Sequence, residues 1–356
     1  MPGGANSRRL IAVAALAAVL SPGFGANAQP ANTNETEMLF LGTGGGPPLA
    51  ANRSKPATLL IVDGRHYLID CGMGTMQRLL QAGVDSQQIR TIFLTHLHAD
   101  HDVGLVDVLA NDYFVLSLRH AADKIAVYGP PQTRELVDVA FRFIAITFRP
   151  FAAENPSTYR SIGGQLTTPF VAHEFGSDGT VFQDDKIRVV AARNSHYALM
   201  PAEFRKTLQS YSYRIETPHG TLVFTGDTGP SEAVSKLAQR ADVLVAEAAV
   251  RDDADREQFV EAMAKRNHWS AARVQSFRAH FQSEHLDTNE IGQLASRAHV
   301  GSVILYHYDP DDNPPHESYV RGVERHFAGP VFAPDDLDRF CMSSGKVHSC
   351  PLAERP

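Results

Sequence analysis

Short apolar runs separated by turn-forming residues recur along most of this chain, and their spacing predicts strands that alternate with helices. Runs with the length and composition of buried strands lie at 38–41, 57–62, 66–70, 90–95, 124–128, 186–193, 210–216, 221–225, 242–246 and 303–306. Helical spacing bounded by capping or breaking residues predicts helices at 74–83, 101–112, 129–144, 230–239, 287–298 and 315–326, and a helical pair over 255–281 that breaks near Asn267. Strands that come early and later alternate with helices fit an α/β fold of two sheets covered by helices.

Two longer segments connect these elements and are candidates to shape a pocket. Residues 145–185 contain Pro150, Pro156 and the pair Gly163-Gly164, so we expect a largely irregular insertion that shapes a pocket. The second segment, 251–281, contains the predicted helical pair. Its aromatic residues either line a pocket for an aromatic group or pack a lid against the core; they are His268, Trp269, Phe277 and Phe281.

The most informative polar segment is Thr95-His-Leu-His-Ala-Asp-His101, which directly follows the apolar run Ile92-Phe93-Leu94. In an extended segment alternate side chains share a face, so His96 and His98 can point at one ion. A helix beginning at Ala99 would turn Asp100 and His101 toward a second point nearby. Imidazole suits zinc, and the carboxylate suits a second divalent ion or a bound water. The alternative is a polar loop that happens to be rich in histidine.

Further polar residues at strand ends count against that alternative. His196 follows the run 189–192, Asp227 follows 222–225 and comes directly after Gly226, and His307 follows 303–306. Each residue alone fits a turn aspartate or a hydrogen-bonded histidine. Together they supply more ligands than one tetrahedral ion accepts, and two ions can hold and ionise a water for hydrolysis.

Blocks of sequence in this order and spacing resemble the metallo-β-lactamase superfamily from about Met38 to about Ala333. The matching blocks are Phe40-Leu-Gly-Thr-Gly-Gly45, Leu68-Ile-Asp-Cys-Gly72, the His96–His101 motif, His196, Thr225-Gly-Asp-Thr228 and Leu305-Tyr-His307. Within the superfamily the chain is most similar to the branch of ribonuclease Z, arylsulfatases and cyclic-nucleotide phosphodiesterases. Two features carry that similarity: Asp70-Cys-Gly-Met-Gly-Thr75, and the late pair Glu247 and His285.

The resemblance implies a four-layered αββα sandwich over residues 38–335 and a site for two Zn²⁺, with Mn or Fe left open. It implies that the first ion is held by His96, His98 and His196, the second by Asp100, His101 and His307, and that Asp227 bridges them. Superfamily members that hold two irons for redox chemistry place a carboxylate where His98 stands, so His98 favours hydrolytic zinc.

The resemblance also implies roles for residues around the ligands. Asp70 would fix the tautomer of a ligand histidine. Glu247 and His285 would form a proton-donating pair near the leaving group, with the carboxylate raising the imidazole pKa, and Asp100 would act beside them as a catalytic residue. The alternative for the pair is a structural hydrogen bond with helix capping. The glycine-rich stretch 42–46 lacks the lysine and helix of a phosphate loop, so we expect a close backbone approach to the metal site.

The ends of the chain indicate export. Arg8 and Arg9 precede the apolar stretch 10–20, and Ala26-Asn-Ala28 offers a cleavage site, so residues 1–28 are interpreted as a signal peptide rather than a membrane anchor. After it we expect a linker at 29–37 and, beyond the hydrolase domain, a C-terminal tail at 336–356. The exported protein would lie in the periplasm or outside the cell, without stable membrane insertion. Cys341 and Cys350 then either form a disulfide or remain free thiols, and Cys71 is expected to be buried.

Composition narrows the function classes. A formal net charge of −7 argues against a nucleic-acid partner, and a 43% hydrophobic content is enough for a substantial core. The favoured function is a binuclear zinc hydrolase of small anionic esters, either phosphodiesters or sulfate esters. A lactonase or β-lactamase on the same metals is the first alternative, and a non-catalytic metal-binding protein is the second. The sequence leaves a homodimer open.

Overall fold

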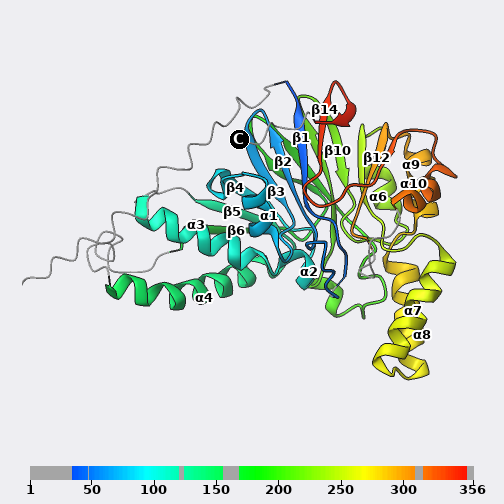
Figure 1. The fold of residues 1–356 in the computed structure, drawn as a ribbon, viewed down its shortest axis with the longest axis horizontal. Coiled ribbons are helices and arrows are strands. Elements are labelled where there is room, and N and C mark those ends of the chain that lie inside the picture. Colours follow the sequence, from blue (N-terminus) through cyan, green and yellow to red (C-terminus); the bar gives the residue numbers. More distant parts are fainter. Residues whose placement is uncertain (1–33, 47, 120–123, 155–167, 309–315, 351–356) are drawn as a thin grey trace, which may run out of the picture. The chain divides into compact units, whose positions relative to one another are not determined.

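The computed structural model describes residues 34–350 except 47, 120–123, 155–167 and 309–315, so the expected signal peptide lies outside the described residues. Within the unit Asn32–Pro356, two mixed sheets pack face to face and helices cover their outer faces (Figure 1). This arrangement confirms the predicted αββα sandwich. No helix in the described part of the chain is both long and apolar enough to cross a membrane.

The first sheet has eight strands in the order β15-β14-β1-β2-β3-β4-β5-β6. The pairs from β3 to β6 are parallel and the others are antiparallel. Its strands are β1 (Thr36–Gly42), β2 (Ala57–Val62), β3 (Arg65–Ile69), β4 (Ile89–Phe93), β5 (Ile125–Gly129), β6 (Phe170–Glu174), β14 (Arg339–Ser343) and β15 (Lys346–Ser349).

The second sheet has seven strands in the order β13-β12-β11-β10-β9-β8-β7. The pairs from β10 to β13 are parallel, so these strands end at the same edge. Its strands are β7 (Gly179–Gln183), β8 (Arg188–Arg193), β9 (Tyr211–Thr217), β10 (Gly220–Phe224), β11 (Val243–Glu247), β12 (Ser302–Tyr306) and β13 (Val331–Phe332).

Alternation along the strands explains why the sheets stack. In β1, Met38 and Phe40 belong to the buried cluster between the sheets, whereas Leu39 and Leu41 belong to the cluster beneath the helices of the first sheet. Strands buried on both faces read as continuous apolar runs, which is the pattern that identified them in the sequence.

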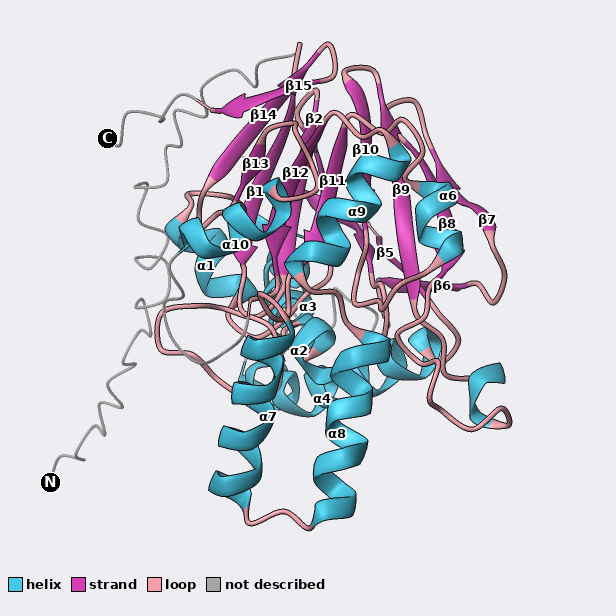
Figure 2. Cartoon of the chain, turned by 90° about the vertical axis from the view of Figure 1, so that its right-hand side faces the viewer, coloured by secondary structure: helices cyan, strands magenta, loops and turns pink. Residues whose placement is uncertain are grey.

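The helices fall into three groups. Helices α1 (Thr75–Gln81), α3 (Leu105–Arg119) and α4 (Thr133–Glu154) cover the first sheet, and α6 (Glu232–Leu237), α9 (Thr288–Ala298) and α10 (His316–Glu324) cover the second. The hairpin of α7 (Asp253–Asn267) and α8 (Ala271–Glu284) extends beyond the strand ends, next to the short α2 (Ala99–Asp102) (Figure 2). The predicted helical pair with a break near Asn267 is therefore confirmed. Short 3-10 turns lie at Ser86–Gln88 and Phe204–Lys206.

Two expectations about regular structure were wrong. Within 145–185 the structure continues α4 to Glu154 and then forms β6 and β7, so the described part of this segment is not an irregular insertion. The stretch 336–356, expected to be a tail, contains β14 and β15, and β14 pairs with β1 so that Met38 lies opposite Phe340. The first sheet therefore continues past residue 335.

Candidate metal centre

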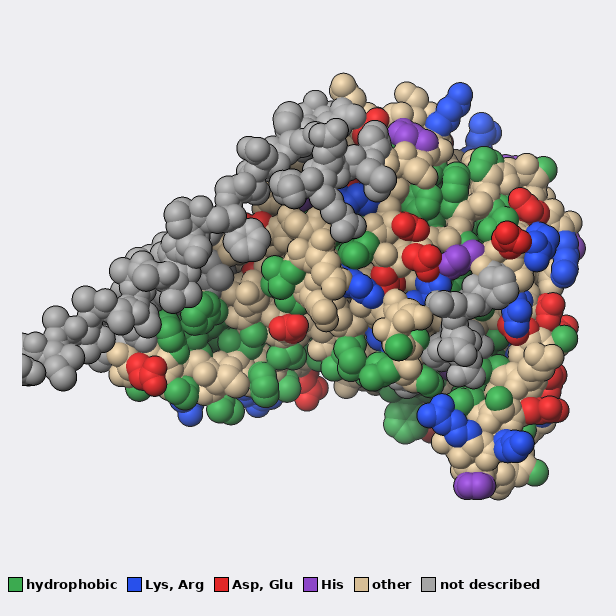
Figure 3. Space-filling view, in the orientation of Figure 1, with side chains coloured by type: hydrophobic (Ala, Val, Ile, Leu, Met, Phe, Trp, Pro, Cys, Tyr) green, Lys and Arg blue, Asp and Glu red, His purple; other side chains and the backbone are tan. Residues whose placement is uncertain are grey.

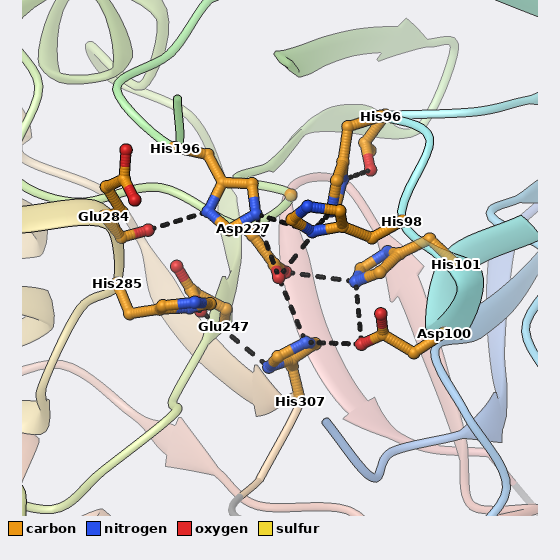
Figure 4. A network of polar contacts seen from close by, with 12 residues as sticks. His96, His98, Asp100, His101, His196, Asp227, Glu247, Glu284, His285 and His307 are labelled. Atoms are coloured by element: carbon orange, nitrogen blue, oxygen red, sulfur yellow. Dashed lines mark hydrogen bonds and ion pairs between the residues drawn. The ribbon is translucent and has the colours of Figure 1, made fainter. Parts of the chain in front are cut away.

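The predicted ligands come from different loops but meet at one edge, where the strands of both sheets end (Figure 4). The segment after β4 and the start of α2 contributes His96, His98, Asp100 and His101; His196 follows β8, Asp227 follows β10 and His307 follows β12. Left-handed backbone at Gly226 (φ 57°) and His307 (φ 60°) turns the chain sharply at two of these ends. The structure brings all seven residues into two adjacent groups of potential metal ligands that share Asp227.

The first group joins three imidazoles and a carboxylate. His98 Nδ1 lies 3.1 Å from His96 Nε2 and 3.0 Å from His196 Nε2, and Asp227 Oδ2 lies 3.8 Å from both Nε2 atoms. His196 donates its Nδ1 hydrogen to the Glu284 carbonyl at 2.9 Å, so its Nε2 presents a lone pair. Zn–N bonds of about 2.0–2.1 Å in a tetrahedron place ligand nitrogens about 3.3 Å apart, which is close to the spacing seen.

Burial prepares these imidazoles as neutral ligands. It lowers the pKa of His196 to about 3 and the pKa of His96 well below its usual value. A neutral imidazole is the form that binds a metal ion. Lone pairs that converge in a buried space repel one another unless a cation lies between them, so the first group fits a bound metal.

The second group contains two imidazoles and two carboxylates. Asp227 Oδ1 lies 3.2 Å from His101 Nε2, and Asp227 Oδ2 lies 3.1 Å from His307 Nε2. Asp100 Oδ2 lies 3.4 Å from His307 Nε2 and 3.7 Å from His101 Nε2. Burial opposes ionisation of Asp227, but His307 and His101 hold its pKa well below the usual value. The carboxylate is therefore ionised; its Oδ1 faces the second group, and its Oδ2 lies between the two groups.

Orphaned polar atoms show that the second group also fits a metal. His101 Nε2, Asp227 Oδ1 and His307 Nε2 are buried without a hydrogen-bond partner among the described residues. A buried polar atom without a partner costs roughly 1–3 kcal/mol, and several in one place indicate an ion or water. The chemistry of both donor sets, imidazole nitrogen and carboxylate oxygen, suits zinc.

Asp70 lies behind the second group. It takes left-handed backbone (φ 56°) after β3 and accepts the Nδ1 hydrogen of His101 at 2.8 Å. Its other oxygen accepts the backbone N–H of Thr95 at 2.8 Å. The carboxylate therefore fixes His101 in the tautomer that presents Nε2 to the metal group, which is the role expected for Asp70.

The glycine-rich stretch also lies where it was expected. A Cβ on Gly45 would be 2.3 Å from His307 Nδ1, so only glycine allows this close backbone approach. Two residues that sequence reasoning missed hold the stretch in place. Lys55 is buried and donates to the Gly45 carbonyl at 2.7 Å. Asp336 accepts from the backbone N–H groups of Thr43 at 2.9 Å and of Ser54 at 2.6 Å.

Glu247 and His285 form the expected pair beside the metal ligands. His285 Nδ1 lies 2.7 Å from Glu247 Oε2, and both side chains are buried. The direction of the pKa change differs from expectation: burial and neighbouring imidazoles lower the pKa of His285, and burial raises the pKa of Glu247. The network continues to two residues that sequence reasoning missed, since His285 Nε2 lies 3.2 Å from His280 Nε2 and His280 Nδ1 lies 2.6 Å from Glu284 Oε2.

A cavity of about 800 Å³ opens from the two ligand groups toward the α7–α8 hairpin. Trp269, Phe277 and Phe281 line it, and Phe277 and Phe281 also pack on Phe259 of α7, whereas His268 does not line it. No described residue of 145–185 lines it either, so the pocket-shaping role expected of that segment is wrong for its described part. The second predicted segment, 251–281, is the one that forms the wall.

Comparisons with known proteins agree with this geometry. A family model described as the beta-lactamase superfamily domain matches residues 65–308. A relative named ribonuclease Z from Mycolicibacterium gilvum is 29% identical over 310 residues, which cover 87% of this chain and 97% of the relative.

Solved structures share the fold at lower sequence identity. The metallo-beta-lactamase fold protein YhfI from Bacillus subtilis matches with a TM-score of 0.61 and 17% identity, covering 86% of this chain and all of that one. The short form of human tRNase Z matches with a TM-score of 0.56 and 21% identity, covering 89% of this chain and all of that one.

Proposed function

The chain belongs to the beta-lactamase superfamily and is a metal-dependent hydrolase, and we propose that it hydrolyses small phosphodiesters or sulfate esters with two bound zinc ions. The observation that carries the proposal is the pair of adjacent ligand groups that share Asp227. A single site would need neither the second set of donors nor a carboxylate in contact with both sets. Binuclear sites of this kind suit displacement at an anionic ester.

Each group of side chains has a distinct task in the proposed reaction. Divalent ions, when bound, would supply an ionised water and positive charge for the anionic ester oxygens. Asp227 joins the two ligand groups, since it contacts His307 in the second and His96 in the first, and Asp100 contacts His307 within the second. The raised pKa of Glu247 favours a proton on the Glu247–His285 pair, and His285 lines the cavity, so the pair is placed to pass a proton through His285 to the departing oxygen.

The relatives bear on the choice of ester. Those named ribonuclease Z favour a phosphodiester over a sulfate ester, and they stand in mild tension with the expectation that nucleic acid is not a partner. The formal net charge of −7 supports a small substrate rather than a folded RNA. A precursor transfer RNA therefore belongs among the substrates tested.

We also propose that the protein acts in an exported location. The disulfide between Cys341 and Cys350 supports an oxidising compartment, in which such bonds persist. This is consistent with the expected signal peptide at 1–28.

The proposal is tested by comparing hydrolysis rates of the zinc-loaded protein on a panel of substrates. The panel is bis(4-nitrophenyl) phosphate, 4-nitrophenyl sulfate, an aryl lactone, a chromogenic cephalosporin and a precursor transfer RNA. We expect turnover of the phosphodiester or the sulfate ester. Asp227→Ala should abolish this turnover and at the same time weaken metal retention. Preference for the lactone or the cephalosporin would overturn the ester assignment, and no turnover of any compound would favour a non-catalytic protein.

The role of His285 is tested with a series of aryl phosphodiesters whose leaving groups differ in pKa. His285→Ala should slow esters with poor leaving groups far more than those with good ones, because only a poor leaving group needs the proton. Metal content should stay at the wild-type value. Equal slowing across the series would remove His285 from this role.

A further inference from the structure

The α7–α8 hairpin lines the cavity with aromatic side chains. The ring centroids of Trp269 and Phe277 are 4.8 Å apart, and those of Phe277 and Phe281 are 5.0 Å apart. Phe281 in turn stacks on His285 at 5.0 Å, with an interplanar angle of 25°. We call Trp269, Phe277 and Phe281 the aromatic wall. It runs without a break from His285, which lies beside the metal ligands, to the end of the hairpin.

Two arginines line the same cavity near the end of the hairpin. Arg266 belongs to the last turn of α7 and Arg273 to the first turn of α8, and the Arg273 guanidinium lies 5.4 Å from the centroid of the Trp269 ring. The carboxylates among the described cavity-lining residues are Asp100 and Asp227, and both belong to the ligand groups. The end of the cavity away from the metal centre is thus positively charged without a lining acid to balance it.

Local helix chemistry does not account for both charges. Ion pairs along a helix join residues three or four apart, and no Asp or Glu occupies such a position relative to Arg266 or Arg273. A cation is favourable in the last turn of a helix, which suits Arg266, but unfavourable in the first turn, where Arg273 lies. Arg278 on the same hairpin provides the contrast, because it is paired with Glu257 at 2.7 Å.

Figure 3 shows Lys and Arg side chains in blue over this projecting hairpin, beside hydrophobic side chains in green. The cavity volume of about 800 Å³ is near the upper end of the range for pockets that hold drug-sized ligands. A small monoanionic ester at the metal centre would leave the aromatic wall and both arginines uncovered.

We infer that the substrate is elongated, with a planar ring that lies on the aromatic wall and a second anionic group that Arg266 and Arg273 bind. This inference rests on the proposed function, because the first anionic group is the ester held at the metal centre. The second group is an oxyanion, either a carboxylate or a phosphate, since guanidinium groups bind both through paired N–H donors. Arg266 and Arg273 are accordingly specificity-determining residues.

The test measures binding, so it does not depend on turnover. Calorimetry at low ionic strength compares biphenyl-4-carboxylate with biphenyl-4,4′-dicarboxylate on the zinc-loaded full chain, in wild type, in the double variant Arg266→Ala/Arg273→Ala and in Arg278→Ala. Arg266 and Arg273 are exposed in the wild-type protein, so we expect the double variant to fold and to keep its zinc. The control Arg278→Ala removes an arginine of the same hairpin that does not line the cavity.

Wild type should bind the dicarboxylate about tenfold more tightly than the monocarboxylate, the scale of one charge-assisted hydrogen bond. The double variant should bind both equally, and Arg278→Ala should keep the preference. No preference in wild type, a preference kept by the double variant, or one lost equally in Arg278→Ala would overturn the inference. A preference without hydrolysis of any ester would instead overturn only the proposed reaction, and hydrolysis without a preference only this inference.

Discussion

At the scale of single residues, Asp70 shows how a side chain that does not face the cavity controls a ligand. One of its oxygens accepts from His101 Nδ1 and the other from the Thr95 backbone N–H. Both interactions require an acceptor, and only a carboxylate offers two. The orientation of His101 therefore depends on the charge state and shape of Asp70.

Asp70→Asn should weaken binding of the second metal ion by about 10–100-fold, the usual effect of losing such a supporting carboxylate. The new amide has one acceptor, so either Thr95 or His101 meets a donor instead. Asparagine tolerates the left-handed backbone at this position, so the fold should survive. Titration with a competing chelator measures the loss. Asp185→Asn, at an exposed carboxylate paired with Arg65, is the control, and equal zinc affinity in the two variants would contradict the role of Asp70.

The metal ligands that were predictable from the sequence share one property: each lies in a segment that directly follows an apolar strand. Parallel strands end at the same edge, so polar residues at their ends, such as Asp227 and His307, can be expected to meet. Asp336 and His280 carried no comparable signal. Asp336 lies far along the chain from Thr43, which it holds, and His280 lies within a helix whose partners are set only by the packing of α8.

At the scale of elements, the sequence predicted the strands that are buried on both faces. The prediction failed where tertiary packing overrides a local signal, as at Pro150 in helix α4. Pro150 predicts a break because proline lacks an N–H and crowds the preceding turn. Helix α4 nevertheless continues for one turn to Glu154, and Phe148 and Ala152 are buried against the first sheet's helix layer. Burial of apolar area at these two positions offsets the local cost of the proline.

The β14–β15 hairpin allows the next prediction. Its disulfide joins Cys341 to Cys350, which are nine positions apart in the sequence, and Cys341 is buried in β14 beside β1. Cys341→Ala/Cys350→Ala should lower the free energy of unfolding by at most about 2–3 kcal/mol on the loop-entropy model. Metal content and turnover should stay at wild-type values, because neither cysteine belongs to the two ligand groups that share Asp227 or lines the cavity.

Denaturant unfolding of the oxidised wild type and the double variant measures the change. Mass spectrometry of unreduced, thiol-blocked protein confirms that the bond is present in the wild type. A variant that keeps its stability but loses activity would show that the hairpin acts on the site, and would contradict a purely structural role.

At the scale of the whole molecule, the sandwich has an apolar core between the sheets and a buried polar region at one edge. The cluster between the sheets is apolar and holds residues such as Phe40, Tyr213 and Val245, whereas one edge buries the ligand histidines and carboxylates. Apolar burial stabilises the fold on its own, but the polar edge costs stability unless its donors and acceptors are satisfied. The polar edge therefore couples the stability of the fold to metal binding.

Removal of metal should lower the melting temperature, and zinc should restore it. Zinc that binds the folded state alone stabilises it by about 2.7 kcal/mol at a free concentration one hundred times the dissociation constant, and by about 4.1 kcal/mol at one thousand times. Calorimetric scans of chelator-treated protein, with zinc added back in steps, should show a rise that saturates only after two equivalents per chain. Asp227→Asn keeps the size of the side chain but removes the charge shared by the two ligand groups, so its melting temperature should respond far less to zinc.

Saturation at one equivalent in the wild type would contradict the bridging position of Asp227. An unchanged melting temperature on chelation would show that the buried histidines and carboxylates are satisfied without an ion, and the binuclear assignment would then fail.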